Sequence, residues 1–270
     1  MPERPPPDGG RARGPVSSHR PSRVPAPLKD RVAVVTGGSS GIGRAACLAL
    51  ARAGARVVVV GRDADRVEAV VAEVRTATEA LGLAGVDVRC EDDVARVVTA
   101  TLDAFGHVDA LVCSAAVGRG RASQGTVPEP VARLPLASFE EIVDTNLRGV
   151  FLMNRAVLPP MIRQRSGQIV NLSSSRILTA GRPFAAPYSA SKLGIVGFSQ
   201  ALAEEVRAHG VRVNVLLPDA VDTPLIHGTT LGAAGALPAE TVGEFIAELI
   251  VFPDDAVLVH PWIASFAVPA

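Results

Sequence analysis

Hydrophobic positions along the chain change their spacing at regular intervals from Asp30 onward. Short runs rich in valine predict strands, and longer stretches with apolar residues every three or four positions predict helices. The predicted strands cover residues 31–36, 56–60, 83–88, 109–113, 168–173, 211–216 and 256–259. The predicted helices lie between them, over residues 42–53, 63–81, 92–105, 138–163, 187–209 and 239–251. Strands that alternate with helices require crossover connections, so this order predicts a doubly wound α/β fold with a seven-stranded, mostly parallel sheet covered by helices on both faces.

The first 27 residues differ in composition from the rest of the chain. They are rich in Pro, Arg, Gly and Ser and contain almost no apolar residues. Such a segment cannot bury enough apolar surface to offset the entropy lost on ordering. We therefore expect a disordered tail over residues 1–27 and one folded domain over residues 28–270. With 270 residues and 48% hydrophobic content, the chain is long enough for one substantial core.

Charge and cysteine content argue against several classes of partner. The 27 basic and 27 acidic residues cancel at pH 7, so nothing in the composition favours binding to nucleic acid or to a membrane surface. Three cysteines without Cys-x-x-Cys spacing do not make a disulfide framework, and we expect a cytoplasmic protein. No apolar run approaches the ~18 residues needed to span a bilayer. No metal site is expected, because metal-ligand spacing is missing from His107, His209, His227 and His260.

A glycine-rich turn, Thr36-Gly-Gly-Ser-Ser-Gly-Ile-Gly43, follows the first predicted strand and opens the first predicted helix. Glycines permit a tight turn and the close approach of a pyrophosphate, and a helix N-terminus offers N–H groups and a positive dipole end. The turn therefore predicts a Rossmann-type dinucleotide site, although a plain strand-to-helix connection would also account for the glycines. The residues expected to contact the dinucleotide are Gly37, Ser39, Ser40, Gly41, Ile42 and Gly43.

The sole tyrosine of the chain, Tyr188, lies four residues before Lys192, one of only two lysines. All other basic residues except Lys29 are arginine, which indicates a specific requirement for lysine at position 192. Residues four apart on a helix share a face, so the phenol and the ammonium can point into one site. An adjacent cation favours the phenolate and lowers the pKa of a phenol from its reference value near ~10. The pair is predicted to be a proton donor and the group that tunes it.

Thr-Gly-x-x-x-Gly-Ile-Gly near the start and Tyr-x-x-x-Lys about 150 residues later resemble the motifs of the short-chain dehydrogenase/reductase family. Residues 28–258 follow the family's order of landmarks, which include the segments 144–146 and 169–175. The resemblance implies an NAD(P)-dependent oxidoreductase that transfers hydride between a nicotinamide cofactor and an alcohol or ketone. It also implies a homodimer or homotetramer.

Carried over residue by residue, the resemblance implies a role for each matching position. Tyr188 exchanges a proton with the substrate oxygen, and Lys192 lowers its pKa and holds the nicotinamide ribose. Asn146 holds a water that resupplies protons. A serine binds the same oxygen: spacing to the tyrosine selects Ser175, and alignment of the strand selects Ser174, which we favour because loops absorb insertions more easily than strand ends. Further cofactor contacts map onto Asp87 and Val88 beside adenine, and onto Ser114, Ala115, Pro218, Val221 and Thr223.

The choice between NADP(H) and NAD(H) depends on the end of the second predicted strand, Gly61-Arg62-Asp63. An acidic side chain there would bind the ribose 2′-hydroxyl, but Gly61 has none, and Arg62 can pair with a 2′-phosphate. We therefore favour NADP(H). Two observations favour NAD(H) instead. Ser40 occupies a position where NADP-selective relatives often carry a basic residue. Asp63 is expected to be a helix N-cap, but it would reach the ribose if the strand ended one residue later.

Two departures from the family pattern bear on the function. Cys113-Ser-Ala-Ala116 replaces Asn-Asn-Ala-Gly, so two amides that tie strands together are missing, and we expect Cys113 to be a buried small residue. Asp219 replaces the glycine of Pro-Gly and would place a carboxylate near the nicotinamide, or else turn to solvent. These departures leave open a catalytically silent dinucleotide-binding regulator. A second alternative is a 3-oxoacyl-carrier reductase, whose acidic carrier would contact a basic patch formed by Arg119, Arg121, Arg176 and Arg182.

Overall fold

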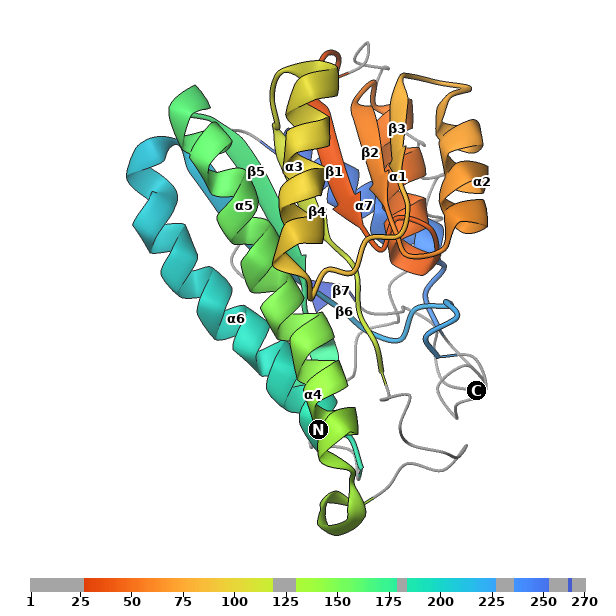
Figure 1. Cartoon of the computed structure of the whole chain (residues 1–270), viewed down its shortest axis with the longest axis vertical. Helices are drawn as coiled ribbons and strands as arrows, with labels where there is room; N and C mark the ends of the chain where they lie inside the picture. Colours follow the sequence, from red (N-terminus) through yellow and green to blue (C-terminus); the bar gives the residue numbers. More distant parts are fainter. Residues whose placement is uncertain (1–26, 119–129, 179–183, 227–235, 253–261, 264–270) are drawn as a thin grey trace, which may run out of the picture.

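The computed structural model describes residues 27–118, 130–178, 184–226, 236–252 and 262–263 (Figure 1). The predicted tail, apart from its last residue, and the predicted strand over residues 256–259 lie outside this part of the chain. Among the helices that are described, none combines the length and the apolar character needed to cross a bilayer.

Within the described residues, seven parallel strands form the sheet, in the order β3-β2-β1-β4-β5-β6-β7. This confirms the predicted α/β fold. Strand β1 borders both β2 and β4, so the strand order reverses there, and ligands of such sheets bind beyond the carboxyl ends of the strands at this point. The strands are β1 (Val32–Thr36), β2 (Arg56–Val60), β3 (Ala80–Leu83), β4 (Ala110–Cys113), β5 (Gly167–Leu172), β6 (Val211–Pro218) and β7 (Trp262–Ile263).

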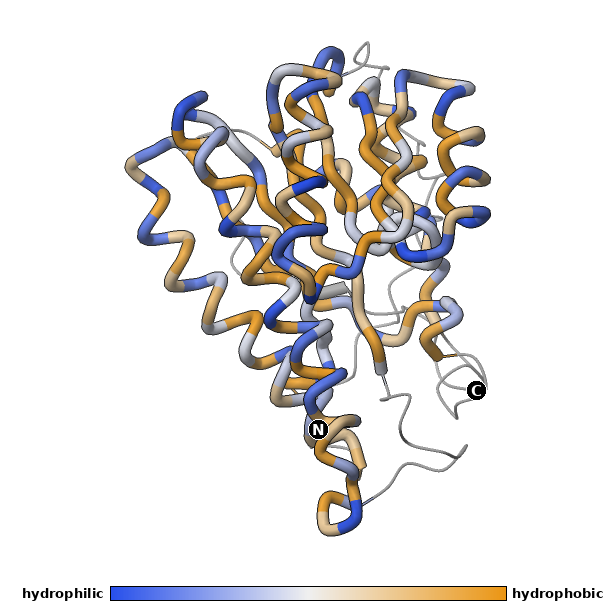
Figure 2. Tube along the Cα trace, in the orientation of Figure 1, coloured by the Kyte–Doolittle hydropathy of each residue, from blue (hydrophilic) through white to orange (hydrophobic). Residues whose placement is uncertain are grey.

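Helices cover both faces of the sheet, and their apolar sides face inward (Figures 1 and 2). One face is covered by α1 (Gly41–Arg52), α2 (Ala64–Val74) and α7 (Ala239–Val251). The other is covered by α3 (Glu91–Phe105), α5 (Gly149–Gln164) and α6 (Ala186–Val206). Helix α4 (Leu136–Val143) runs into α5 through one π-helical turn, Asp144–Arg148.

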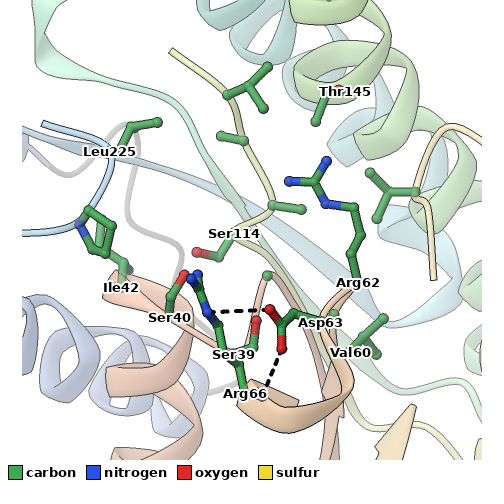
Figure 3. A pocket seen from close by; sticks show the side chains of 18 of the residues that line it. Ser39, Ser40, Ile42, Val60, Arg62, Asp63, Arg66, Ser114, Thr145 and Leu225 are labelled. Atoms are coloured by element: carbon green, nitrogen blue, oxygen red, sulfur yellow. Dashed lines mark hydrogen bonds and ion pairs between the residues drawn. The ribbon is translucent and has the colours of Figure 1, made fainter. Parts of the chain in front are cut away.

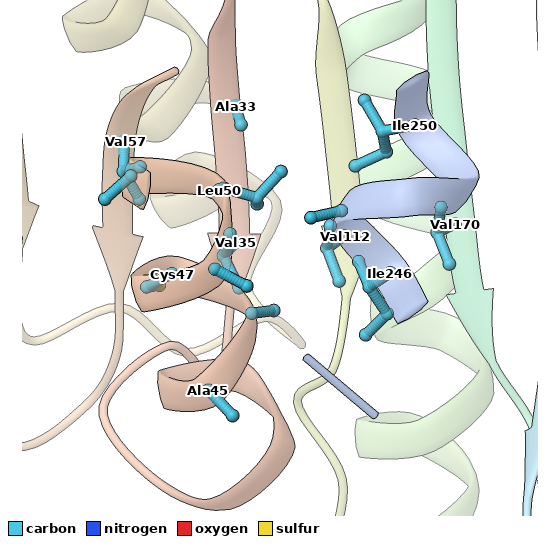
Figure 4. Close-up of a cluster of buried hydrophobic side chains, with 14 of the residues drawn as sticks. Ala33, Val35, Ala45, Cys47, Leu50, Val57, Val112, Val170, Ile246 and Ile250 are labelled. Atoms are coloured by element: carbon cyan, nitrogen blue, oxygen red, sulfur yellow. The ribbon is translucent and has the colours of Figure 1, made fainter. Parts of the chain in front are cut away.

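Alternate residues of each strand face opposite layers, which gives the domain two apolar cores. Figure 4 shows Val35 and Val57 near α1 and Val112 and Val170 near α7, and the chain neighbours Val34 and Val58 belong to the core on the opposite face. Glycine permits the close approach of α7 to α1: a Cβ added at Gly243 would lie 2.5 Å from a backbone carbon. Continuous burial explains why the strands read as uninterrupted valine runs.

The prediction was wrong for the second helix and the third strand. Helix α2 ends at Val74 instead of continuing to residue 81, because the turn after it bonds back onto the helix: Thr76 Oγ1 donates to the Glu73 carbonyl at 2.7 Å. Strand β3 covers Ala80–Leu83, not 83–88. Residues 84–88 form the loop after β3, where Val86 and Val88 are buried in the core below the sheet edge.

Candidate active site

A cleft of about 340 Å³ lies at the carboxyl ends of β1, β2 and β4, where the strand order reverses (Figure 3). Its size is within the usual range of small-molecule sites. The predicted cofactor residues that line it are Gly37, Ser39, Ser40, Gly41, Ile42, Arg62, Asp87, Val88, Ser114, Ala115 and Thr223. The predicted cofactor residues that lie outside this lining are Gly43, Pro218, Val221, Tyr188 and Lys192.

The glycine turn has the shape that a pyrophosphate requires. Gly37 and Gly41 have φ values of 64° and 50°, in the left-handed region that favours glycine. A Cβ at Gly37 would lie 2.8 Å from the backbone of Ala115, and one at Gly43 would lie 2.2 Å from the Gly37 carbonyl oxygen. Within helix α1, which is described in full, the first turn holds no acidic residue, and Ser40 makes no side-chain capping bond. The N–H groups of this turn are therefore available to an anion, and the residues present fit a dinucleotide.

The loop after β2 and the first turn of α2 each supply one arginine to the cleft. Arg62 extends toward Thr145, while Arg66 of α2 extends toward the glycine turn (Figure 3). The sequence analysis did not identify Arg66 as a residue of this cleft. Its spacing of four residues from Arg62 could have indicated that the two arginines lie near one another. Asp63 caps α2, because its Oδ1 accepts from the Arg66 N–H at 3.0 Å, and its Oδ2 lies 3.5 Å from Arg66 Nε.

Gly61 leaves no room for an acidic side chain at the end of β2. A Cβ built there would lie 2.8 Å from Val67 Cγ2 and 2.9 Å from Ser39 Oγ. The hydroxyl of Ser39 thus occupies the space that the first atoms of an aspartate would need. Asp63 also lines the cleft, where its carboxylate accepts from the Arg66 N–H and lies near the Arg66 guanidinium.

Asp87 and Val88 line the cleft from the loop after β3. The carboxylate of Asp87 accepts from Arg89 Nε at 3.0 Å and from Arg89 NH2 at 2.6 Å. This hydrogen bonding holds the pKa of Asp87 below its ordinary value, and the charge of Arg62 acts in the same direction. The backbone N–H of Asp87 donates to Asp93 Oδ2 at 2.9 Å, which fixes the loop on the first turn of α3.

A buried pair of amides lies beside Cys113, the first residue of the segment that departs from the family pattern. Asn154 of α5 and Asn171 of β5 exchange reciprocal side-chain hydrogen bonds at 3.0 and 3.2 Å, and Asn171 also donates to Ser199. Asn154 Nδ2 lies 3.6 Å from Cys113 Sγ, so the buried network passes directly beside that strand end. Burial raises the pKa of Cys113 to about 12, which makes the thiol a poor nucleophile, as expected for a small packing residue.

Tyr188 and Lys192 lie on one face of α6, as their spacing predicts. Lys192 is only 4% exposed, its Nζ donates to the Leu172 carbonyl at 2.8 Å, and it lies 5.7 Å from the centre of the Tyr188 ring. Burial lowers the pKa of Lys192 from 10.5 to about 8. The ammonium is thus held under the phenol ring by the end of β5.

The pKa of Tyr188 is raised in this structure, although it was expected to be lowered beside Lys192. Burial raises the pKa of the phenol above its ordinary value, because a phenolate would lose its hydration there. The groups that act in the opposite direction are Ser174, through a side-chain hydrogen bond, and the charge of Arg176. Lys192 Nζ donates to the Leu172 carbonyl beside the ring, and its charge does not outweigh the burial of the phenol.

The side chains of three consecutive serines after β5 form hydrogen bonds to three different residues. Ser173 Oγ donates to the Lys192 carbonyl at 2.9 Å, the Ser174 hydroxyl is hydrogen bonded to the Tyr188 phenol, and Ser175 Oγ donates to Asp219 Oδ1 at 3.2 Å. All three serines are buried. Of the two serines left open by the sequence, Ser174 is the one that contacts the tyrosine.

Asn146 is fully buried in the π-helical turn before α5. Its Oδ1 accepts from the Val117 N–H at 2.8 Å, and its Nδ2 donates to the Val117 carbonyl at 3.0 Å and to Ser191 Oγ at 3.1 Å. The side chain therefore joins the loop after β4 to α6 one residue before Lys192. Its side-chain amide is bonded to these protein groups, and the water-binding role expected of Asn146 stays a prediction.

The segment after β6 connects the reactive end to the cleft. Pro218 ends β6, Val221 bridges to Leu237, and Thr223 lines the cleft. A Cβ at Gly41 would lie 3.0 Å from Thr223 Cγ2, so this segment closes against the glycine turn.

Comparisons with known proteins agree with this geometry. The family model described as short chain dehydrogenase matches residues 31–232. A 3-oxoacyl-[acyl-carrier-protein] reductase from Synechocystis sp. is 36% identical over 81% of this chain and 82% of its own length. A 2-dehydro-3-deoxy-L-rhamnonate dehydrogenase (NAD(+)) from Sphingomonas sp. is 36% identical over 73% of this chain and 74% of its own length.

Among solved structures, a metagenomic short-chain oxidoreductase in complex with NADP superimposes with a TM-score of 0.77. It is 31% identical, and the match covers 90% of this chain and 100% of that one. The glycine turn, the tyrosine with its buried lysine and these matches together establish that the chain belongs to the short-chain dehydrogenase/reductase family, whose members are NAD(P)-dependent oxidoreductases acting on CH–OH and C=O groups.

Proposed function

We propose that this protein interconverts a ketone and an alcohol with NADP(H), using Tyr188 as the proton donor. The observation that carries the proposal is the hydrogen bond between Ser174 and Tyr188, above a buried lysine and next to a cleft shaped for a dinucleotide. When bound, the nicotinamide cofactor supplies the hydride chemistry. The chain's own residues orient the substrate and move one proton.

In the direction of reduction, Tyr188 donates its phenolic proton to the carbonyl oxygen, and Ser174 hydrogen bonds the same oxygen and stabilises its developing charge. Loss of the proton leaves a phenolate in a buried site. The ammonium of Lys192, 5.7 Å from the ring centre, offsets that charge and so lowers the barrier. With a pKa of about 8, Lys192 is predominantly charged at pH 7.

Asn146 serves as a positioning residue in this proposal. Its three side-chain hydrogen bonds join Val117 and Ser191 to the turn between α4 and α5, and Ser191 precedes Lys192 on α6. Replacing it with leucine removes these bonds and lets the lysine shift. The expected result is a lower kcat that Asn146→Asp, which keeps the acceptor for Val117, partly restores.

Tyr188→Phe tests the proton donor, because it removes one oxygen and keeps the ring. We expect kcat for ketone reduction with NADPH to fall by roughly 10²–10⁴-fold while NADPH still binds. Ser174→Ala is expected to lower kcat as well, and Ser173→Ala serves as the matched serine control. Turnover that survives in Tyr188→Phe contradicts the assignment. Cofactor binding by wild type without turnover on a carbonyl panel favours the silent regulator instead.

The preference for NADP(H) is supported by the two arginines that line the cleft and by the lack of space at Gly61. Arg66 extends toward the glycine turn and Arg62 toward Thr145, so the two side chains flank the ribose end of the cleft (Figure 3). We expect Arg66→Gln to weaken NADPH binding by about 10-fold or more and to leave NADH binding nearly unchanged, since a charged hydrogen bond contributes roughly 1.5–3 kcal/mol. Equal dissociation constants for NADPH and NADH in wild type would contradict the preference.

A carrier-bound acyl substrate is a second candidate, favoured by the similarity to the Synechocystis reductase and by the position of Arg176, two residues after Ser174. Arg119, Arg121 and Arg182 lie outside the described residues. Comparing kcat/KM for an acetoacetyl group on an acidic carrier protein with that for the same group on a short thiol decides between the two. A preference for the carrier that Arg176→Gln removes supports this candidate.

A homodimer or homotetramer is supported by apolar side chains that remain exposed on α4, α5 and α6. Phe139, Phe151 and Leu193 are 42%, 41% and 52% exposed, respectively. Sedimentation of wild type and of Phe151→Glu/Leu193→Glu tests this, and we expect the double variant to have the mass of a monomer.

A further inference from the structure

A carboxylate lies next to the reactive hydroxyls. Strands β5 and β6 are adjacent and parallel, with Leu172 opposite Leu216, so the residues that follow both strands meet at the same edge of the sheet. There Ser175 Oγ donates to Asp219 Oδ1 at 3.2 Å. Ser174, the chain neighbour of Ser175, is bonded to the Tyr188 phenol, so adjacent residues of one loop contact the carboxylate and the proton donor.

The chain that carries Asp219 leads from this point to the cofactor cleft. Thr223, four residues later, lines the cleft and lies against Gly41 of the glycine turn. Hydride transfer needs the donor carbon about 3–3.5 Å from the carbonyl carbon. Residues 219–223 therefore connect the cleft with the loop whose serines contact Asp219 and the Tyr188 phenol.

The nicotinamide ring changes its charge during the reaction. In reduction, a hydride leaves the neutral ring for the carbonyl carbon, the proton of Tyr188 goes to the carbonyl oxygen, and the ring becomes positively charged. A carboxylate fixed near the ring stabilises the oxidised, cationic form relative to the reduced form. We propose that the Asp219 carboxylate, positioned by Ser175, stabilises the positive charge of the oxidised ring. The site then binds NADP⁺ more tightly relative to NADPH than the same site without this carboxylate would. This inference rests on the function proposed above.

Asp219→Asn is the appropriate test, because it keeps the size and the acceptor for Ser175 and removes the charge. Asp222→Asn is the matched control: it removes an exposed carboxylate from the same segment, three residues away. Dissociation constants for NADP⁺ and NADPH are measured by titration calorimetry for wild type and both variants. We expect the ratio Kd(NADP⁺)/Kd(NADPH) to rise by roughly 3- to 10-fold in Asp219→Asn and to stay within error in Asp222→Asn.

The ratio also separates failure of this inference from failure of the proposed function. If wild type binds both forms and reduces ketones in a Tyr188-dependent way, but the ratio is the same in Asp219→Asn, the carboxylate does not sense the ring and the inference is overturned. It is likewise overturned if Asp219→Asn changes only the KM of the ketone, since Asp219 then contacts substrate. If wild type has no Tyr188-dependent turnover, the proposed function itself fails. Ser175→Ala, which frees the carboxylate, is expected to give a smaller change of the same sign.

Discussion

Replacing Lys192 with methionine is expected to stabilise the cofactor-free protein at neutral pH while impairing its reaction. Lys192 is 4% exposed, and burial lowers its pKa from 10.5 to about 8. This displacement corresponds to a cost of about 3 kcal/mol for carrying the charge in the folded state. Methionine has a similar length and carries no charge. Losing the bond from Nζ to the Leu172 carbonyl offsets about 1.5 kcal/mol, so the net gain at pH 7 is roughly 1–2 kcal/mol.

The sign of the pH dependence follows from the lowered pKa. Between pH 8 and pH 10.5 the unfolded chain binds more protons at this lysine than the folded protein does, so the contribution of Lys192 to stability becomes more favourable as the pH rises. Its destabilising effect is complete below pH 8 and disappears by about pH 10.5. The advantage of Lys192→Met over wild type should therefore shrink by about 3 kcal/mol across this window and reverse at its upper end.

The free energy of unfolding in urea is measured for wild type, Lys192→Met and Lys29→Met at pH 7 and pH 10. The test is how the difference between each variant and wild type changes between the two pH values. Lys29 is exposed and is the other lysine of the chain, so its replacement controls for the loss of one ammonium. The difference between wild type and Lys192→Met should depend on pH, and that between wild type and Lys29→Met should not. A Lys192→Met protein that is destabilised equally at both pH values would refute the reasoning, because it would mean that the lysine stabilises the fold through contacts that do not depend on its charge.

Three further outcomes are expected. Gly61→Asp should destabilise the fold by about 1–3 kcal/mol through the Ser39 and Val67 contacts, and Ser39→Gly should recover part of that loss in thermal unfolding. Asn171→Leu should cost roughly 2–3 kcal/mol in urea unfolding by leaving Asn154 and Ser199 unpaired, and the double change with Asn154→Leu should cost less than the sum of the single changes. Asp63→Ala should cost about 1 kcal/mol as a lost helix cap without weakening NADH binding, whereas weaker NADH binding would place Asp63 at the ribose.

The fold was predictable wherever burial leaves a local signature. Strand β2 and helix α7 begin and end at the predicted residues, because an unbroken valine run and a strong apolar periodicity each leave little choice. Strand β3 was misplaced because its sequence, Ala-Leu-Gly-Leu, contains no β-branched residue. The β-branched residues Val86 and Val88 follow just after it and drew the prediction there. Pairing with β2, with Val57 opposite Ala80, decides that strand's position, and pairing is not a local property.

The candidate site shows the same division between local and long-range determinants. Spacing along a helix is enough to bring Tyr188 and Lys192 together, and the order strand–turn–helix is enough to locate the glycine turn. The amide pair Asn154–Asn171 and the direction of Arg66 depend on side chains that meet only after packing. The pKa of Tyr188 could not be predicted from the neighbouring cation alone, because burial outweighs it.

The charge of Asp219 and the pKa of Tyr188 act differently on the reaction. Burial raises the pKa of Tyr188, so the phenol keeps its proton at neutral pH. Reduction of a ketone leaves a phenolate at this position and oxidation of an alcohol needs one, so burial of the phenol opposes proton transfer in both directions. The groups that favour the phenolate, Ser174 and Arg176, offset part of that cost. Reduction also creates positive charge on the nicotinamide ring, which the proposed position of the Asp219 carboxylate stabilises. Of these features, Asp219 is therefore the one that lowers the barrier for carbonyl reduction relative to a site that lacks it.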